Sequence, residues 1–310
     1  MTDETAEGWF AGLDPADADA AAARIRDGEA AAAADWPALA VERGFATDTD
    51  DYYDRLHEAT VAAARTGVRE RELADDQQLI HAVRAMDDCD RTANELAERV
   101  AEWAGTRHDD AGTGVEYARE LADSESAATD PAEVRLQSLA ARVADLAAEA
   151  DDLREFVTET APTVAPNLAA MAGPVLAARL IALAGGLDSL AKKPSGTVQV
   201  LGAEDALFAH LRGSAPSPKH GVIYTHEYVR GTHPDERGSA ARALAGKLTL
   251  AARVDHYGGE RKPGLDAELD ERIAVIRART GDGSDDESGS EDDPADASGG
   301  EDDPGVTGRD

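Results

Sequence analysis

Two stretches of the chain place apolar residues at alternating spacings of three and four, which lines one face of an α-helix. The first extends from about Glu70 to Trp103 and the second from Leu136 to Val157. A polar, glycine-containing connection from Gly105 to Pro131 separates them. We therefore predict two helices that fold back on each other as an antiparallel coiled-coil hairpin. The apolar positions are Leu79, Ala82, Met86, Cys89, Ala93, Leu96, Val100 and Trp103 in the first helix and Leu136, Leu139, Val143, Leu146, Ala150, Leu153 and Val157 in the second.

An apolar stripe on a helix needs a partner that covers it. The hairpin meets this need by pairing with itself, and its outer faces can in addition form a homodimer; the sequence leaves both arrangements open. Cys89 lies on the stripe, and we interpret it as a small core residue, not a nucleophile. Because it is the one cysteine of the chain, an internal disulfide and a cysteine-based zinc site are excluded.

The segment after the hairpin is also predicted to be largely helical. Alanine-rich helical spacing runs through APNLAAMAGPVLAARLIALAGGLDSLAKKP, with breaks at Pro174 and Pro194. Arg237 to Tyr257 predicts a helix of about 30 Å, and Leu265 to Arg279 predicts a final one. The interrupted apolar run within this segment favours a buried helix over a membrane span.

Only two short segments indicate extended structure. TVQVL (197–201) and GVIYTH (221–226) alternate in hydropathy, which is typical of short strands or extended turns. The predicted fold class is therefore mainly α. We place the hairpin at residues 71–160 and a C-terminal domain at residues 161–280.

The two ends of the chain have a different character. Residues 1–70 carry short apolar clusters separated by Ala, Asp and Gly, which fits a small α/β or mostly helical domain. Residues 281–310 contain twelve Asp and Glu and one Arg, with Gly, Ser and Pro between them. Such a segment cannot bury enough apolar surface to fold, so we predict a disordered acidic tail.

Composition narrows the setting in which the protein works. The net charge is −32, aromatic residues make up 4% of the chain, and arginine nearly replaces lysine. This balance is expected of a protein kept soluble in concentrated salt. The N-terminus MTDETAEGWF has neither the basic nor the apolar region of a signal peptide. We therefore expect a cytoplasmic protein that is not attracted to anionic membranes.

The charge reverses in one region. All five lysines lie between residues 192 and 262, where eleven basic residues face seven acidic ones, a net of +4. A positive segment in so acidic a chain predicts a surface for a polyanion, with nucleic acid as the first candidate. The acidic tail is interpreted either as a solubility segment or as a competitor of RNA for this positive segment.

Several cations occupy positions that would reduce the entropic cost of binding phosphate. Pro218 and Gly221 bracket Lys219 and His220 on a turn, and Lys192 and Lys193 stand just before Pro194. Cations on such turns are pre-positioned, although ordinary surface lysines are the alternative. Arg242 and Arg253 are eleven residues apart, so they share one helix face that could follow a phosphate backbone.

Other chemistry fits the sequence poorly. The histidines between 210 and 256 lack metal-ligand spacing, so neither zinc nor iron is predicted. Gly246-Lys247 lacks a phosphate-binding glycine loop, and Glu204 and Asp205 are adjacent acids whose side chains face apart. We predict a binding protein without catalytic activity, metal or cofactor, and a nuclease or methyltransferase is disfavoured.

The chain resembles the Nop family, the core proteins of archaeal box C/D guide ribonucleoproteins, over residues 74–279. The resemblance lies in the blocks DDQQLIHAVRAMDDCDRTANELAERVAEW, APNLAAMAGPVLAARLIALAGGLDSLAKKP, QVLGAEDALFAHLRG, PKHGVIYTH and RGSAARALAGKLTLAARVDHYGG. The chain is identified as a shortened, haloarchaeal-type member. A spliceosomal relative, or a helical protein-interaction module without an RNA partner, is the alternative.

The family resemblance implies a scaffold with several partners. An all-helical Nop domain would bind a guide RNA kink-turn that already carries a small ribosomal-protein-like partner, and the coiled coil would self-associate. The N-terminal domain would hold fibrillarin, the methyltransferase that uses S-adenosylmethionine to modify a ribose 2′-hydroxyl.

The resemblance also assigns residues by position. Lys192, Lys219 and His220 correspond to turn residues near RNA, and Lys193 adjoins them. Arg237, Arg242, Lys247 and Arg253 are similar to the basic residues of the family helix. Glu204 and the turn around Leu207 and Phe208 resemble the part that meets RNA and the small partner together.

Three features depart from the family pattern. Asp205 stands where the family usually has lysine after Gly-Ala-Glu, and Ser239 replaces the lysine of Arg-Gly-Lys. The N-terminal region is short and acidic. In molar salt, counterion release contributes little to RNA affinity, so we expect a few fixed hydrogen bonds and shape to carry binding.

Overall fold

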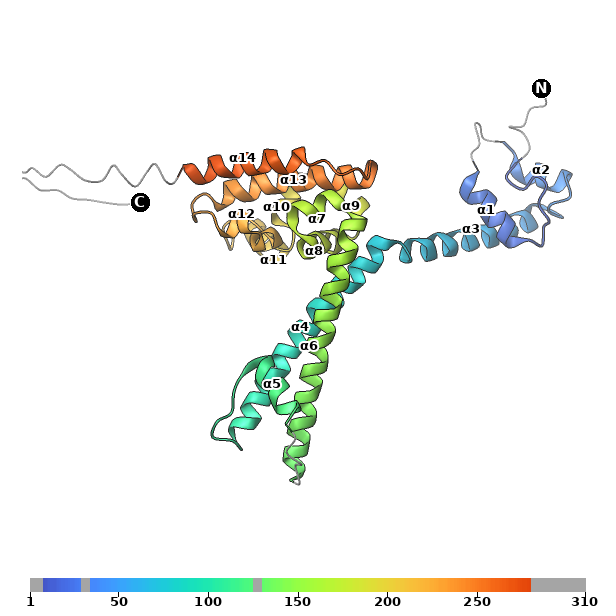
Figure 1. Cartoon of the computed structure of the whole chain (residues 1–310). Coiled ribbons are helices and arrows are strands. Elements are labelled where there is room, and N and C mark those ends of the chain that lie inside the picture. Colours follow the sequence, from blue (N-terminus) through green and yellow to red (C-terminus); the bar gives the residue numbers. More distant parts are fainter. Residues whose placement is uncertain (1–7, 29–33, 125–129, 280–310) are drawn as a thin grey trace, which may run out of the picture.

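The protein consists of helices arranged as an arm, a stalk and a C-terminal block (Figure 1). The computed structural model describes residues 8–28, 34–124 and 130–279. Every regular element within these ranges is a helix, which confirms the predicted mainly α fold. Of the two alternatives for the N-terminal unit, the described residues therefore show the helical one, because they contain no strand of an α/β unit. The predicted acidic tail, residues 281–310, lies outside the described residues.

The arm is the N-terminal unit. It comprises α1 (Ala18–Asp27), α2 (Trp36–Glu42) and the long α3 (Thr49–Glu72). Its small core is aromatic: Phe10, Phe45 and Tyr52 are buried, and the ring centroids of Phe10 and Phe45 lie 5.3 Å apart. Aromatic side chains supply much buried area per residue, which lets so few residues build a core.

The stalk is formed by α4 (Asp75–Gly105) and α6 (Pro131–Val164), which pack along their length. Leu79, Met86, Val100, Leu136 and Val143 of the predicted stripes are buried. Cys89 is half-buried, in keeping with a packing role. The connection between the two helices contains α5 (Gly114–Ala122), a further helix that packs against both and that the polar composition did not reveal.

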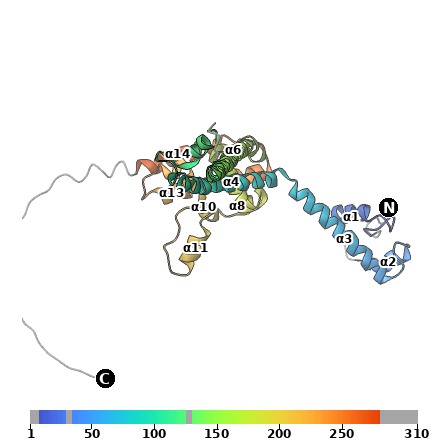
Figure 2. The ribbon, with the colours of Figure 1, turned by 90° about the horizontal axis from the view of Figure 1, so that it is seen from below.

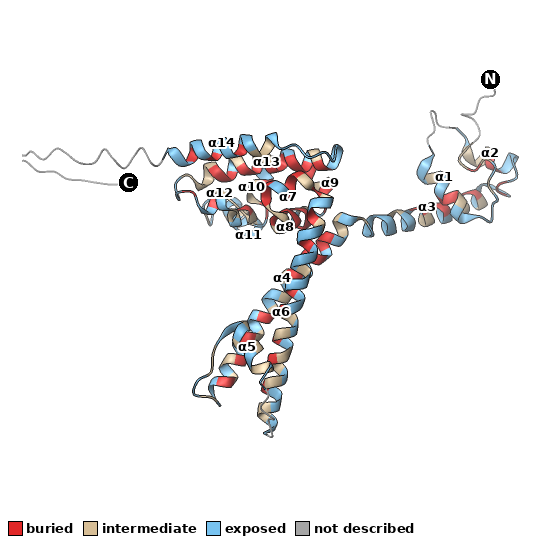
Figure 3. Ribbon diagram, in the orientation of Figure 1, coloured by how far each residue is buried: buried red, intermediate tan, exposed pale blue. Residues whose placement is uncertain are grey.

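The C-terminal block surrounds α13. Its elements are α7 (Pro166–Ala172), α8 (Pro174–Ala184), α9 (Leu187–Lys192), α10 (Ser195–Val200), α11 (Glu204–Leu211), the 3₁₀ helix η2 (Val222–Thr225), α12 (Glu227–Arg230), α13 (Arg237–Tyr257) and α14 (Gly264–Ala278). Buried residues concentrate in this block and at the adjoining base of the stalk (Figure 3). Because α13 contacts α7, α9, α10, α12 and α14, it holds the block together.

The two predicted extended segments are wrong. TVQVL lies mostly in α10, and GVIYTH forms η2. The segments do approach each other: Gly221 N donates to Gln199 O at 2.9 Å, and Val222 N donates to Leu201 O at 2.7 Å. A Cβ at position 221 would lie 2.1 Å from Leu201 O, so glycine permits this close contact between two turns.

A buried carboxylate joins the beginning of α7 to the end of α13. Asp255 Oδ1 accepts hydrogen bonds from Asn167 N at 2.9 Å and Asn167 Nδ2 at 2.6 Å, and Asp255 Oδ2 accepts one from Leu168 N at 2.8 Å. Asn167 Oδ1 in turn accepts from Lys262 N at 2.6 Å. Asp255 thereby satisfies donors at the helix start that no N-cap side chain reaches.

The arm meets the stalk and the block around a bidentate ion pair, beside which Gln78 Nε2 of α4 donates to Glu72 O of α3 at 2.8 Å. Arg71, near the end of α3, donates to both carboxylate oxygens of Asp76 in α4, and Asp76 Oδ2 also accepts from Leu187 N at 3.0 Å. Burial alone would raise the pKa of Asp76, but these hydrogen bonds lower it below its usual value. A Cβ on Gly186 would lie 2.4 Å from Arg71 Nη2, so this joint requires glycine there.

His226 predicts a pH dependence of stability. Its Nδ1 accepts from Tyr228 N at 3.1 Å at the start of α12, so the other nitrogen, Nε2, carries the proton that it donates to Met171 O at 3.1 Å. Burial lowers the pKa of His226. A histidine with a lowered folded-state pKa binds fewer protons when folded, so stability is full above about pH 6.5 and falls as pH drops through that value.

We therefore expect chemical denaturation midpoints to decrease between pH 7.5 and pH 5.5, and to decrease less in His226→Asn. Asparagine can still cap Tyr228 N but does not titrate. His81→Asn on the exposed surface of α4 serves as the control. An equal decrease in His226→Asn and the unmodified protein would contradict the assignment.

Candidate nucleic-acid interface

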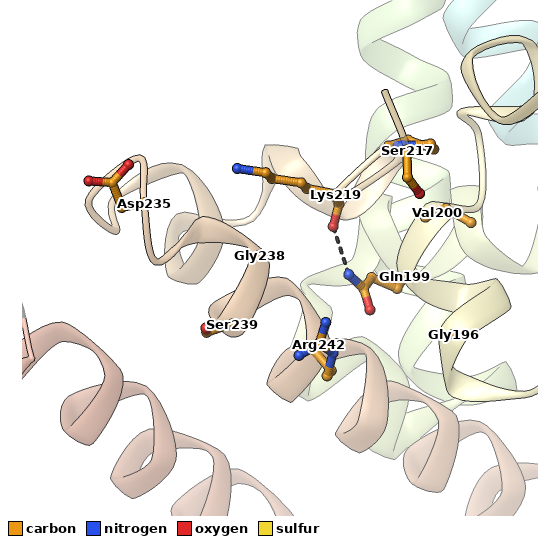
Figure 4. Close-up of a pocket in the computed structure, with 10 residues that line it drawn as sticks. Gly196, Gln199, Val200, Ser217, Lys219, Asp235, Gly238, Ser239 and Arg242 are labelled. Atoms are coloured by element: carbon orange, nitrogen blue, oxygen red, sulfur yellow. Dashed lines mark hydrogen bonds between the residues drawn. The ribbon is translucent and has the colours of Figure 1, made fainter. Parts of the chain in front are cut away.

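A cleft of about 540 Å³ opens between α10, the turn before η2 and the first turns of α13 (Figure 4). It brings together two of the predicted cations, Lys219 and Arg242. Its lining residues are Gly196, Gln199, Val200, Ser217, Pro218, Lys219, Asp235, Gly238, Ser239 and Arg242. The cleft therefore combines positive charge, hydroxyl and amide groups, which suits the oxygens of a phosphate.

The backbone of Lys219 is fixed by its neighbours. Gln199 Nε2 donates to Lys219 O at 2.7 Å. The side chain passes over the first turn of α13, where a Cβ on Gly238 would lie 3.8 Å from Lys219 Cδ. The turn that Pro218 begins is therefore held against both α10 and α13, and the ammonium group is pre-positioned at the cleft.

The two cations of the cleft have no acidic partner among the described residues. Neither the ammonium of Lys219 nor the guanidinium of Arg242 lies within 4.0 Å of a carboxylate in residues 8–28, 34–124 and 130–279. Asp235 also lines the cleft, but its carboxylate lies 3.7 Å from His233 Nδ1. Because their charge is not neutralised by the fold, the two cations can bind an external anion.

Arg242 also borders a second hollow of about 310 Å³ between α13 and α14. Lys247 and Arg272 line it together with the exposed Leu250. Lys247 donates to Glu268 of α14, so its charge is partly neutralised. The positive surface thus continues from the cleft along α13, with weaker charge.

Two predicted site residues stabilise the turn instead of facing the cleft. The ring of His220 stacks on Tyr224 with centroids 4.5 Å apart, and the Arg237 guanidinium carbon lies 5.6 Å from the Tyr224 centroid. Arg237 also donates from Nε to Thr232 O at 3.1 Å. Burial, followed by the charges of Arg237 and Lys219, lowers the pKa of His220.

The remaining predicted cations lie toward the other end of α13. Lys192 Nζ pairs with Asp188 at 2.6 Å, which raises the pKa of the lysine. Arg253 Nε donates to Ala191 O at 3.0 Å, and Lys193 follows α9 directly. The predicted basic residues therefore follow the length of α13 instead of meeting at one point, and only Lys219 and Arg242 share the cleft.

Helix α11 stands away from the block (Figure 2). None of its residues is buried, and Phe208 and Leu211 are 56% and 71% exposed. The predicted site residue Glu204 begins this helix, and its carboxylate accepts from Gly202 N at 2.9 Å. The sequence placed Leu207 and Phe208 beside a partner only through family resemblance. Leu207 is half-buried, and the exposure of Phe208 could not be predicted from hydropathy, which favours burial.

The described ranges contain no group of three or more His, Cys, Asp or Glu side chains that could hold a metal ion. No single helix there is long and apolar enough to cross a membrane, although α7 and α8, bent by 118°, pass that test together by length and composition.

Comparison with known proteins gives a consistent result. The Nop family model, described as "snoRNA binding domain, fibrillarin", matches residues 73–275. An uncharacterized NOP5 family protein of Methanocaldococcus jannaschii is 32% identical over an alignment of 273 positions, and the match covers 77% of this chain and 66% of the relative. Nucleolar protein 58 of Candida albicans is 32% identical over an alignment of 235 positions, and the match covers 64% of this chain and 46% of the relative.

The chain is thus shorter than the relatives it matches, and it spans about half the length of nucleolar protein 58. Among solved structures, the crystal structure of a fibrillarin/Nop5p complex contains a chain that is similar at 22% identity and a TM-score of 0.48. The matched region covers 87% of this chain and 99% of that one.

Proposed function

Since the chain belongs to the Nop family, we propose that it is a non-catalytic scaffold of box C/D ribonucleoproteins. In this role it binds the kink-turn of a guide RNA together with a small ribosomal-protein-like partner. It also recruits a fibrillarin-like methyltransferase, which modifies ribose 2′-hydroxyls of ribosomal or transfer RNA. The catalytic step and the S-adenosylmethionine cofactor belong to that partner.

The observation that carries this proposal is the cleft with two unneutralised cations. In a chain of net charge −32, long-range attraction to RNA is unfavourable, so binding depends on local contacts. Lys219 and Arg242 are presented on a fixed turn and a long buried helix, which reduces the entropy lost on binding. Their positions, a turn and a helix on opposite sides of one cleft, suit two oxygens of an RNA backbone.

The N-terminal arm is the part proposed to hold fibrillarin. It precedes the region matched by the family model, which begins at residue 73, and its last helix, α3, leads into the stalk. A hollow of about 470 Å³ lies between the loop at Phe10 to Pro15 and the segment Arg43 to Phe45. The rigid aromatic core beneath that hollow offers a preformed surface for a protein partner.

Self-association is proposed to use the stalk. The tip of α4 and α6, with α5 against them, has its own buried cluster that includes Ala97, Val100 and Leu136. The stalk therefore holds its shape away from the C-terminal block and can present an outer face to a second copy.

A gel-shift titration tests the proposed function. At about 2 M KCl, we expect the chain to bind a kink-turn guide RNA only when the small partner is present, and to retain fibrillarin in the complex. A duplex of equal length without the kink-turn serves as the matched control. Equal affinity for both RNAs, or no binding to either, would contradict the scaffold assignment and favour a protein-interaction module.

A further inference from the structure

The end of α14 lies beside the cleft. Arg279 Nη1 lies 3.7 Å from Glu236 Oε2, the residue immediately before α13, and Arg277 Nη2 donates to Glu227 O at 2.9 Å. Gly238 and Ser239, two and three residues after Glu236, line the cleft. The chain therefore leaves the described structure next to the Lys219–Arg242 cleft.

The residues that follow carry the charge opposite to that of Lys219 and Arg242. Residues 281–310 contain twelve acidic residues and one arginine, whereas Lys219 and Arg242 have no carboxylate partner among the described residues. Arg272 adds a further positive charge to the neighbouring hollow. A run of carboxylates resembles a nucleic-acid backbone in offering many negatively charged oxygens along one chain.

Length does not prevent contact. Thirty residues can span up to about 100 Å at roughly 3.3 Å per residue, whereas the whole of α13 is about 30 Å long. Covalent attachment also gives a linked segment an effective concentration on the order of millimolar. Even weak individual ion pairs can then keep the cleft occupied.

We propose that the acidic segment 281–310 docks in the Lys219–Arg242 cleft of its own chain and competes with non-cognate RNA. The contact itself follows from the charge and the chain path; the competition rests on the proposed function. A kink-turn RNA held by its partner makes many contacts and displaces the segment, whereas loosely bound RNA does not. Salt screens the carboxylate contacts, so the effect is strongest at low ionic strength.

Carbodiimide cross-linking of the full chain tests the contact without RNA. The reagent joins carboxylates to lysines, and the five lysines, which lie at different places in the C-terminal block, act as reporters of where the acidic segment binds. At about 0.1 M KCl, we expect cross-links from residues 281–310 to Lys219 at several times the yield found at Lys192, Lys193 and Lys262, and their loss at about 2 M KCl. Equal yields at all five lysines, or none at Lys219, would overturn the proposal.

Binding of polyuridine tests the competition. We expect truncation after residue 280, and a full-length variant with all twelve acids changed to Asn or Gln, each to tighten binding about tenfold at 0.1 M KCl. The gain should vanish when Lys219 and Arg242 are both alanine. If the tail variants still bind polyuridine more tightly when Lys219 and Arg242 are alanine, the tail acts by general charge repulsion of RNA, and competition at the cleft is refuted.

The two proposals fail in different ways. If kink-turn RNA does not bind under any condition, the scaffold function is wrong, while the cross-links to Lys219 still decide whether the acidic segment docks. If cross-links form but neither tail variant alters polyuridine binding, the docking stands and the competition is refuted.

Discussion

Replacing Lys219 and Arg242 together by alanine is expected to weaken assembly on kink-turn RNA about a hundredfold. A charge-assisted hydrogen bond contributes roughly 1.5–3 kcal/mol, and two such contacts correspond to about 3 kcal/mol, or two orders of magnitude in Kd. The effect should be large because neither cation has an acidic partner within the described residues, and cognate RNA displaces the acidic segment proposed to dock there. Lys219→Ala alone should cost more than the loss of any one acid of the tail.

Titrations over a range of KCl concentrations measure both the affinity and its salt dependence. The double variant should reduce the slope of log K against log salt by about 0.7–0.9 for each lost phosphate contact. Lys262→Ala, an exposed lysine beyond the other end of α13, is the matched control and should leave affinity unchanged. If Lys262→Ala weakens binding as much as Lys219→Ala does, the cleft is not the specific site.

Adding a positive charge to the cleft complements the removal of Lys219 and Arg242. Ser239 lines the cleft, so Ser239→Lys adds a third cation there. It should strengthen RNA binding and steepen the salt dependence, whereas Ser239→Gln should do neither.

Asp255→Ala is expected to lower the free energy of unfolding by about 3–5 kcal/mol. The substitution leaves three buried donors of Asn167 and Leu168 without their acceptor, and removing one partner of a buried charged network is strongly destabilising. It also disconnects the start of α7 from the end of α13, so it weakens the helix on which Arg242 lies.

Guanidinium denaturation followed by circular dichroism measures this effect. Glu260→Gln is the control because its side chain is exposed and only its backbone carbonyl joins the network, as an acceptor for Asn167 Nδ2; surface changes of this kind stay within about 0.5 kcal/mol. An Asp255→Ala midpoint equal to that of Glu260→Gln would show that solvent replaces the carboxylate.

Long periodic segments were the most predictable part of the fold. The helix predicted at Arg237 to Tyr257 has those same bounds as α13, because its apolar positions repeat over five turns and all pack on one side. Alternating hydropathy over only five or six residues gave a wrong prediction of extended structure at TVQVL and GVIYTH. In these segments, Pro194 before α10 and the close approach at Gly221 favour short helical turns instead of strands. The two segments are about 20 residues apart in the sequence, so a local pattern does not reveal their contact.

The candidate site was harder to predict in detail. The sequence identified the basic residues, and Lys219 and Arg242 were among them. It could not tell which cations the fold neutralises, because Glu268 pairs with Lys247 and the carbonyl of Thr232 binds Arg237 only after α13 and α14 have packed. Nor could it show that Phe208 and Leu211 stay exposed on a helix that stands apart.

The ion pair between Arg71 and Asp76 has a mechanical consequence. Helix α3 extends about 36 Å from that joint, so it acts as a lever that pivots on a few contacts: the Arg71–Asp76 pair, the hydrogen bond from Leu187 N to Asp76, and the hydrogen bond from Gln78 to Glu72 O. A tilt of about 10° at this pivot would move the far end by about 6 Å over that length. The proposed methyltransferase, if carried at that end, would therefore be displaced by about this distance while the Lys219–Arg242 cleft stays unchanged.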